Sequence, residues 1–192
     1  MIGGYPLRRI WRRPDLSDLT LGPCLLRHHY GINREFLMQR PLDGLLYPFR
    51  DSAGLRPEPP SERCFGVGYG EFCGGWVMAA TYICQMTGDS ELRRRLDEVL
   101  DGLVACGQAT STGYLAISAR PYPAYYARGV MLHALRVAAE FTKRSDVGRL
   151  LTATTEHVVA SLRALGREKA RRVIRGEYPW WDEGNGLCEV LA

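Results

Sequence analysis

The spacing of apolar residues along the chain predicts helices. In residues 90–106, apolar side chains recur every three or four positions and charged side chains fill the opposite face, which is the pattern of an amphipathic helix. The preceding segment, 71–86, is apolar on nearly every side. A helix that is apolar all round is buried between other elements, so we expect 71–86 to be an inner helix and 90–106 an outer helix that faces water. The apolar set of the outer helix is Leu92, Leu96, Val99, Leu100 and Leu103.

The same pair of helices is predicted a second time. Residues 124–141 are again apolar nearly all round, and the segment that follows, up to about residue 165, carries charge on one side. In each pair a threonine ends the first helix and an aspartate opens the second, at Thr87–Asp89 and Thr142–Asp146. Gly88 suits the left-handed position after a helix, and Asp89 suits an N-cap. Repeated helical hairpins of ~40 residues are typical of a solenoid or a closed toroid, so we predict an all-α fold of repeated antiparallel helical hairpins.

The two ends of the chain interrupt this regularity. We expect residues 1–30, which contain three prolines, to form an irregular N-terminal segment, and residues 31–192 to form one helical domain. A short helix is predicted to start near Ile32 and to end at Pro41, and residues 51–62 are predicted to form a long loop. Residues 184–192 begin another apolar helix that ends after about two turns without a cap. We therefore expect the chain to be the truncated first part of a longer domain.

Composition and charge exclude several classes of protein. The 192 residues are 46% hydrophobic and 24% charged, which is typical of a globular protein and too apolar for a disordered one. No apolar run approaches the ~18 residues of a membrane span, and no apolar stretch follows the basic N-terminus as in a secretory signal. A net charge of +4 is too small to indicate nucleic acid. We therefore expect neither a membrane nor a nucleic acid as partner.

The six cysteines do not have the spacing of zinc ligands. None forms a Cys-x-x-Cys pair and none has a histidine at zinc-finger spacing, so we expect no cofactor in this segment. Without a secretory signal, free thiols in a reducing compartment are the favoured interpretation, which predicts a cytoplasmic protein. Cys73 and Cys84 are eleven positions apart and share a helix face, which is typical of small core residues.

A series of short motifs runs in order from about residue 30 to the end of the chain. The motifs are Asn33-Arg34-Glu35-Phe36-Leu37, Leu45-Leu46-Tyr47-Pro48-Phe49-Arg50, Ala53-Gly54-Leu55, Phe72-Cys73-Gly74-Gly75-Trp76, Thr87-Gly88-Asp89, Leu96-Asp97, Gly113-Tyr114-Leu115, Tyr125-Tyr126 and Gly184-Asn185-Gly186-Leu187-Cys188-Glu189-Val190-Leu191. On these motifs the chain resembles the N-terminal half of the catalytic domain of the β-L-arabinofuranosidase-like glycoside hydrolases. The resemblance implies a partial (α/α)6 toroid of the six-hairpin glycosidase type, a role in carbohydrate metabolism, and hydrolysis of terminal sugars from glycans.

The chain departs from the family pattern at two places. The family usually has histidines at the positions of Glu71 and Gly75, one of which reaches the sugar, and a His-Lys pair where this chain has Arg128-Gly129. The family's acid/base glutamate, its zinc-binding Glu and Cys, and its paired late cysteines, one of them the nucleophile, would lie beyond residue 192. The resemblance therefore implies zinc in a full-length relative rather than in this segment, and Cys188 is not the nucleophile.

The first candidate site lies at the start of the first inner helix. In a helical toroid, the loops at one end of the inner helices form the pocket, and a glycosidase needs two carboxyl groups beside the bond that it cleaves. Glu71 and Trp76 are therefore expected to contact substrate. The alternative for Glu71 is a charge that stabilises the helix N-terminus. Tyr122, Tyr125 and Tyr126 either line the pocket or form a packed turn with the neighbouring prolines.

The second candidate site is the run Trp180-Trp181-Asp182-Glu183. Paired aromatic rings stack on sugar rings, and adjacent carboxylates bind hydroxyls or transfer protons. The alternative is a loop in which Trp180 and Trp181 fill the core and Asp182 and Glu183 cap the next helix. For His133 and His157, which lie within helical segments without a second ligand at i+4, a structural role is favoured.

These features leave three functional hypotheses. The chain is part of a glycoside hydrolase with a carbohydrate partner, and lacks the catalytic residues itself. Alternatively it is a noncatalytic helical carbohydrate-binding or interaction module, which would form a homodimer if the chain is complete, because its inner helices would otherwise be exposed. The third hypothesis is an active relative that uses Glu71 and Glu183 as its carboxyl pair.

Overall fold

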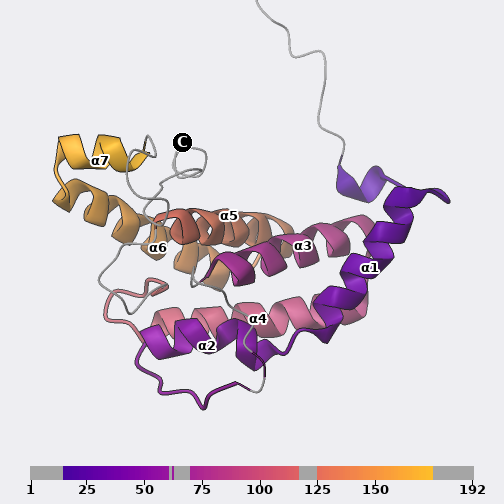
Figure 1. Ribbon diagram of the computed structural model, residues 1–192, viewed down its shortest axis with the longest axis horizontal. Helices are drawn as coiled ribbons and strands as arrows, with labels where there is room; N and C mark the ends of the chain where they lie inside the picture. Colours follow the sequence, from indigo (N-terminus) through magenta and orange to yellow (C-terminus); the bar gives the residue numbers. More distant parts are fainter. Residues whose placement is uncertain (1–14, 61, 63–69, 117–124, 175–192) are drawn as a thin grey trace, which may run out of the picture.

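The fold is seen in a computed structural model that describes residues 15–60, 62, 70–116 and 125–174, and every regular element within these ranges is helical. The prediction of an all-α protein is thereby confirmed. A short 3-10 helix, η1 (Leu16–Asp18), precedes the α-helices (Figure 1). Their bounds are α1 (Leu25–Gln39), α2 (Leu42–Ser52), α3 (Glu71–Thr87), α4 (Ser90–Gln108), α5 (Tyr125–Thr142), α6 (Ser145–Ala164) and α7 (Arg167–Ile174).

Helices α3 and α5 lie side by side at the centre of the molecule (Figure 1). They run in the same direction, because Gly75 and Val130 line one hollow near their first turns and Gln85 and Glu140 line another near their last turns. The helices approach closely at Gly74, where a Cβ atom would lie only 2.8 Å from Cγ1 of Val130. The absence of a side chain at Gly74 therefore sets the spacing of the central pair.

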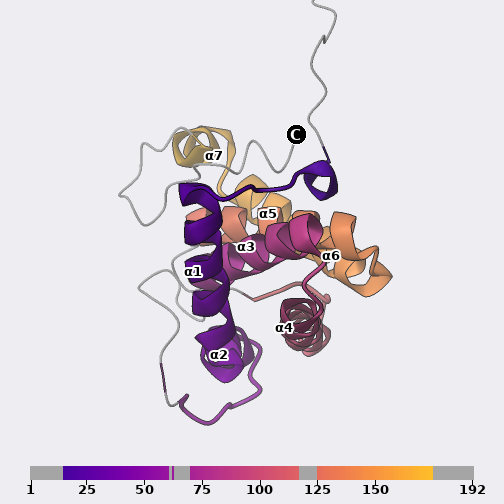
Figure 2. The ribbon, with the colours of Figure 1, turned by 90° about the vertical axis from the view of Figure 1, so that its right-hand side faces the viewer.

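The other helices pack around this pair (Figure 2). Helix α4 contacts α2, α3 and α6, while α6 lies against α5, and α1 crosses α3 and α4. The predicted apolar face of α4 is fully buried, which confirms its amphipathic pattern. All five of its predicted members have almost no exposed surface: Leu92, Leu96, Val99, Leu100 and Leu103.

The turn between α3 and α4 has the predicted chemistry. Gly88 adopts the left-handed conformation, with φ of 68°, and the Asp89 carboxylate accepts a hydrogen bond from the backbone N–H of Leu92 at 2.9 Å. The turn between α5 and α6 differs from this prediction. Helix α6 begins at Ser145 after an N-cap, Arg144, that makes no side-chain cap, and Asp146 lies inside the first turn. The prediction of an aspartate at the helix start is right for α4 and displaced into the first turn in α6.

The N-terminal part of the chain is more helical than the pattern predicted. Helix α1 begins at Leu25 rather than near Ile32, so residues 25–30 are not irregular. Helix α2 was not predicted at all. Its prolines explain this, since Pro41 is the N-cap, where no backbone N–H is needed, and Pro48 is tolerated inside a helix whose Phe49 is fully buried.

Among the described residues, none of the helices combines the length and apolar character that crossing a bilayer requires.

Candidate functional site

A hollow of about 560 Å³ lies between α1, α3 and α5, at the first turns of α3 and α5. We call it the α3 hollow. Helix α3 supplies most of its wall, helix α1 adds Asn33, Phe36 and Leu37, and α5 adds Tyr126 and Val130. Three helices that are far apart in the sequence therefore contribute to one concave surface.

The structure brings the candidates Glu71 and Trp76 together in this hollow. Glu71 is exposed in the first turn of α3, directly after Gly70, whose left-handed backbone (φ 103°) provides no side-chain cap. Its carboxylate therefore lies at the positive end of the helix dipole and is also open to a ligand. This position fits both interpretations of Glu71, as a residue that contacts substrate and as a charge that stabilises the helix N-terminus.

Trp76 has a structural bond as well as a place in the wall. Its side chain is only 3% exposed, and its indole N–H donates a hydrogen bond of 3.1 Å to the backbone carbonyl oxygen of Leu37. The polar atom of the ring is thus already used to hold α1 against α3. Trp76 offers an apolar surface to the hollow rather than a hydrogen bond.

Two more aromatic rings give the hollow its walls. Phe36 of α1 and Phe72 of α3 meet edge to face, with 6.3 Å between ring centroids, and both are partly exposed. Tyr126 of α5 is also 39% exposed at the rim. The sequence predicted a pocket or a packed turn for Tyr126 but missed Phe36 and Phe72, whose meeting depends on the crossing of α1 over α3.

Gly75 leaves open space in the wall of the hollow. No atom lies within 4 Å of the place where a Cβ would stand, in contrast to the crowded Gly74 next to it. This is the second position at which the family resemblance implies a histidine, and the glycine leaves it without a side chain. A carboxylate, an amide from Asn33 and a phenol from Tyr126 supply the polar groups instead.

The other candidate run, Trp180-Trp181-Asp182-Glu183, lies outside the described residues, so its relation to the α3 hollow stays a prediction. Among the described residues that line the hollow, Glu71 is the one acidic side chain. The described part of the hollow is therefore a mainly apolar surface with a single carboxyl group at its rim.

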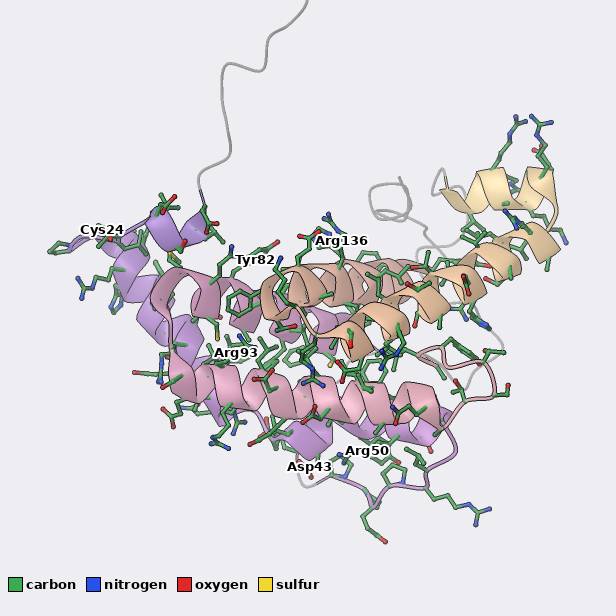
Figure 3. The ribbon with its side chains drawn as sticks, turned by 180° about the vertical axis from the view of Figure 1, so that it is seen from behind. Cys24, Asp43, Arg50, Tyr82, Arg93 and Arg136 are labelled. Carbon is green, nitrogen blue, oxygen red and sulfur yellow. The ribbon has the colours of Figure 1, made fainter. Side chains whose placement is uncertain are left out.

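A second, more polar hollow of about 460 Å³ lies near the last turns of α3 and α5. It is lined by Tyr82 and Gln85 of α3, by His133 and Arg136 of α5, and by Asp15 beside η1. Figure 3 shows Tyr82 and Arg136 on these neighbouring helices. Arg136 forms an ion pair with Glu140 one turn later, and Gln85 donates to the Asp15 carboxylate at 3.4 Å. Four polar side chains of this hollow thus bind one another in pairs.

The described residues do not supply a set of metal ligands. Nowhere in the described ranges do three or more His, Cys, Asp or Glu side chains lie so that they could hold a metal ion. Cys73, Cys84 and Cys106 are free, buried thiols, and burial raises the pKa of Cys84 and of Cys106 to about 11. Cys73 and Cys84 have the core role that their spacing predicted, since both are buried in the apolar core.

One comparison with known proteins assigns the chain to a family. The model of the family described as "Beta-L-arabinofuranosidase, GH127 catalytic domain" matches residues 19–185. The chain belongs to this family. No curated protein and no solved structure matches the chain. The resemblance deduced from the motifs is confirmed, and the matched region contains both the α3 hollow and the run of residues 180–183 of this GH127-family chain.

Proposed function

We propose that the chain is the N-terminal part of a glycoside hydrolase of β-L-arabinofuranosidase type, and that its α3 hollow binds a terminal sugar of a glycan. The observation that carries this proposal is an aromatic-walled hollow with Glu71 at its rim in a chain of the GH127 family. Sugar rings pair an apolar C–H face with polar hydroxyls. Phe72 and Trp76 suit the former, and Glu71 with Asn33 suits the latter.

The proposed architecture is a partial (α/α)6 toroid. In this arrangement α3 and α5 are inner helices and α4 and α6 are outer helices. Two features support it: α3 and α5 run in the same direction, and each is followed after a short turn by a helix with one charged side. The N-terminal turns of the inner helices then surround the sugar site, as at Glu71.

A second candidate function is a noncatalytic carbohydrate-binding module. Among the described residues of the α3 hollow, Glu71 is the one carboxyl group, whereas hydrolysis of a glycosidic bond uses two.

In the third hypothesis, an active relative with its own carboxyl pair, Glu183 supplies the other carboxyl group. Its prediction is specific: Glu71→Gln and Glu183→Gln would each abolish release of L-arabinose from an aryl β-L-arabinofuranoside, and unchanged release in either variant refutes it.

Binding of L-arabinose, measured by isothermal titration calorimetry, tests the proposal. We expect Glu71→Gln to weaken binding roughly tenfold, because a charge-assisted hydrogen bond to a sugar hydroxyl is lost. Glu168→Gln is the matched control, since Glu168 is also a first-turn acid but lies on α7, away from the hollow. Equal affinities of the wild type and Glu71→Gln would remove Glu71 from the site, and absence of binding would refute the proposal.

We further propose that the protein acts in a reducing compartment, the cytoplasm. The support is that Cys24, Cys73, Cys84 and Cys106 are free thiols, and Cys24 is exposed.

A further inference from the structure

Arg128 is a charged side chain that the proposed sugar site does not use. It lies in the first turn of α5 but contacts α6, while its neighbour Tyr126 lines the α3 hollow. Its guanidinium carbon is 5.5 Å from the centroid of the Tyr125 ring, and Nη1 donates to the hydroxyl of Ser161 at 3.4 Å. Within the described part of the chain, no carboxylate pairs with Arg128.

The groups around Arg128 are neutral. The hydroxyls of Tyr125 and Ser161 are 3.4 Å apart, and Tyr114 stacks on the His157 ring with 3.7 Å between centroids and nearly parallel planes. Burial lowers the pKa of His157 below its ordinary value of 6.5, and the positive charge of Arg128 lowers this pKa further, so the imidazole is neutral at pH 7. The cluster therefore carries a single positive charge.

A half-buried guanidinium without a counter-ion is costly, because it has lost part of its hydration. A planar carboxylate matches the fork of guanidinium donors, and its one negative charge balances the one positive charge of the cluster, whereas a phosphate brings up to two. We propose that Arg128, with the hydroxyls of Tyr125 and Ser161, forms a binding site for one carboxylate group.

The carboxylate has two sources. One is an acidic sugar that binds at this end of the helices. The other is a carboxyl side chain of the chain's own residues 175–192, which lie outside the described residues: Glu177, Asp182, Glu183 and Glu189.

The imidazole of His157 reports on the site, since burial and the charge of Arg128 on α5 lower its pKa, and the Tyr114 ring stacks on it. The experiment titrates His157 by NMR, with D-glucuronate and with the neutral sugar D-glucose. A glucuronate carboxylate beside Arg128 offsets the guanidinium charge, so the pKa of His157 should rise with glucuronate and not with glucose. Arg128→Met should weaken glucuronate binding roughly ten- to a hundredfold. Arg136→Met, on the same helix, should leave it unchanged.

The second arm tests the chain's own carboxylates in the full chain. If one of them is bound already, glucuronate has no effect on the wild type. Neutralising that residue, for example with Asp182→Asn or Glu183→Gln, then lowers the pKa of His157 and makes it respond to glucuronate. Arg128→Lys is the milder variant should Arg128→Met fail to fold, because it keeps the charge and loses the fork.

Two results overturn the proposal. The first is a His157 pKa that rises in Arg128→Met yet responds neither to glucuronate nor to neutralisation of any of the four acids. The second is a His157 pKa that is the same in the wild type and Arg128→Met, which would show that the guanidinium is not beside the imidazole. Neither result depends on L-arabinose binding, which tests the α3 hollow separately.

Discussion

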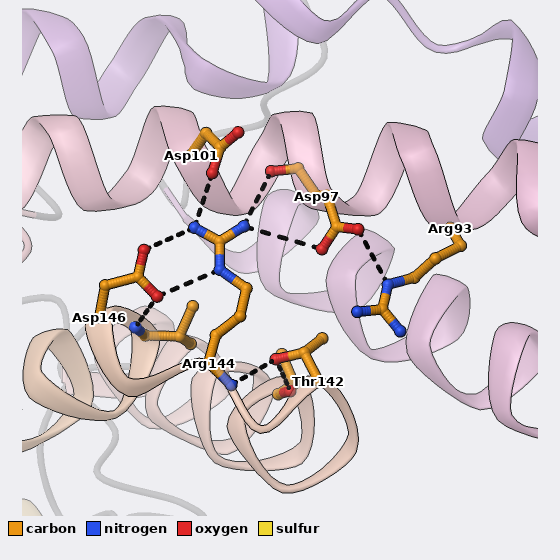
Figure 4. A network of polar contacts seen from close by, with 8 residues as sticks. Arg93, Asp97, Asp101, Thr142, Arg144 and Asp146 are labelled. Atoms are coloured by element: carbon orange, nitrogen blue, oxygen red, sulfur yellow. Dashed lines mark hydrogen bonds and ion pairs between the residues drawn. The ribbon is translucent and has the colours of Figure 1, made fainter.

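Arg144 contacts three carboxylates at once. It precedes α6, and its guanidinium contacts the carboxylates of Asp101 and Asp146 at 2.6 Å and that of Asp97 at 3.7 Å (Figure 4). Asp97 and Asp101 belong to α4, so Arg144 joins α4 to α6. Because Arg144 is mostly buried while Asp101 is exposed, the network is only partly screened by water.

Removal of the guanidinium should therefore destabilise the protein. We expect Arg144→Met to lower the free energy of unfolding by about 1–2 kcal/mol, since three carboxylates lose their shared partner. Arg149→Met is the control, because Arg149 is an exposed residue of α6 that donates a long hydrogen bond of 3.4 Å to the Ser145 hydroxyl. Urea denaturation measures both. Equal losses in the two variants would show that the network adds no stability.

The same contact predicts a pH dependence. Hydrogen bonding to Arg144 lowers the pKa of Asp146 to about 2, from an ordinary value of 3.8. A carboxyl whose pKa is lowered by folding stabilises the folded state above its unfolded pKa, and this contribution disappears as the pH falls through the folded value. Wild-type stability should therefore drop between about pH 4 and pH 2. In Arg144→Met the drop attributable to Asp146 should shrink to the part that the Val147 backbone N–H, which still donates to this carboxylate at 2.9 Å, provides. An identical pH profile of the two proteins, followed by urea denaturation, would contradict this.

At the scale of helices, two adjacent glycines have opposite roles. A Cβ at Gly74 would meet Val130 at 2.8 Å and the Met131 sulfur at 3.1 Å, whereas a Cβ at Gly75 would meet open space. We expect Gly74→Ala to destabilise the protein by about 1–3 kcal/mol, because α3 and α5 must move apart. Gly75→Ala should stabilise it by about 0.5–1 kcal/mol through helix propensity. Thermal unfolding distinguishes the two variants. If Gly74→Ala also stabilised the protein, α3 and α5 would be shown to accommodate the added methyl group without loss of packing.

The apolar residues of α3–α6 predicted these helices, because α3 and α5 are apolar nearly all round while α4 and α6 each carry charge on one side only. Helix α3 was expected over 71–86 and spans Glu71–Thr87. Helix α1 lacks this signal in its first turns, since Leu25 and Leu26 are exposed there, and the two prolines concealed α2. A helix can therefore be predicted from the sequence where its own apolar residues form a continuous pattern. It cannot be predicted where contacts with distant residues stabilise it.

The candidate site likewise contains residues that the sequence predicted and residues that only the packing of the helices brings there. Glu71 and Trp76 belong to one helix, so their common position could be deduced from the sequence. Phe36 and Asn33 reach the α3 hollow because α1 crosses α3, and no local pattern encodes that crossing. From the sequence, Arg128 is only a departure from the family pattern. That no carboxylate of the described residues pairs with it follows from the packing of α6 beside α5.

At the scale of the whole molecule, the α3 hollow is also the place where apolar surface is exposed. Phe36, Phe72 and Tyr126 gather there, each between 37% and 41% exposed. Clustered aromatic side chains at the surface mark either a ligand site or a contact with another chain. A homodimer formed through this surface would cover the same residues that we assign to the sugar, so dimer formation and sugar binding should compete.

Sedimentation equilibrium tests this competition. We expect the wild type to dimerise as its concentration rises, Phe72→Asp to stay monomeric because a carboxylate would be buried in the contact, and L-arabinose to shift the wild type toward the monomer. Leu55→Asp is the control, since Leu55 is a comparably exposed apolar residue that does not line the hollow. A wild type that is monomeric at every concentration would refute the dimer and leave the exposed aromatic residues to the sugar. A dimer that Phe72→Asp and L-arabinose both leave intact would place the contact on a different surface.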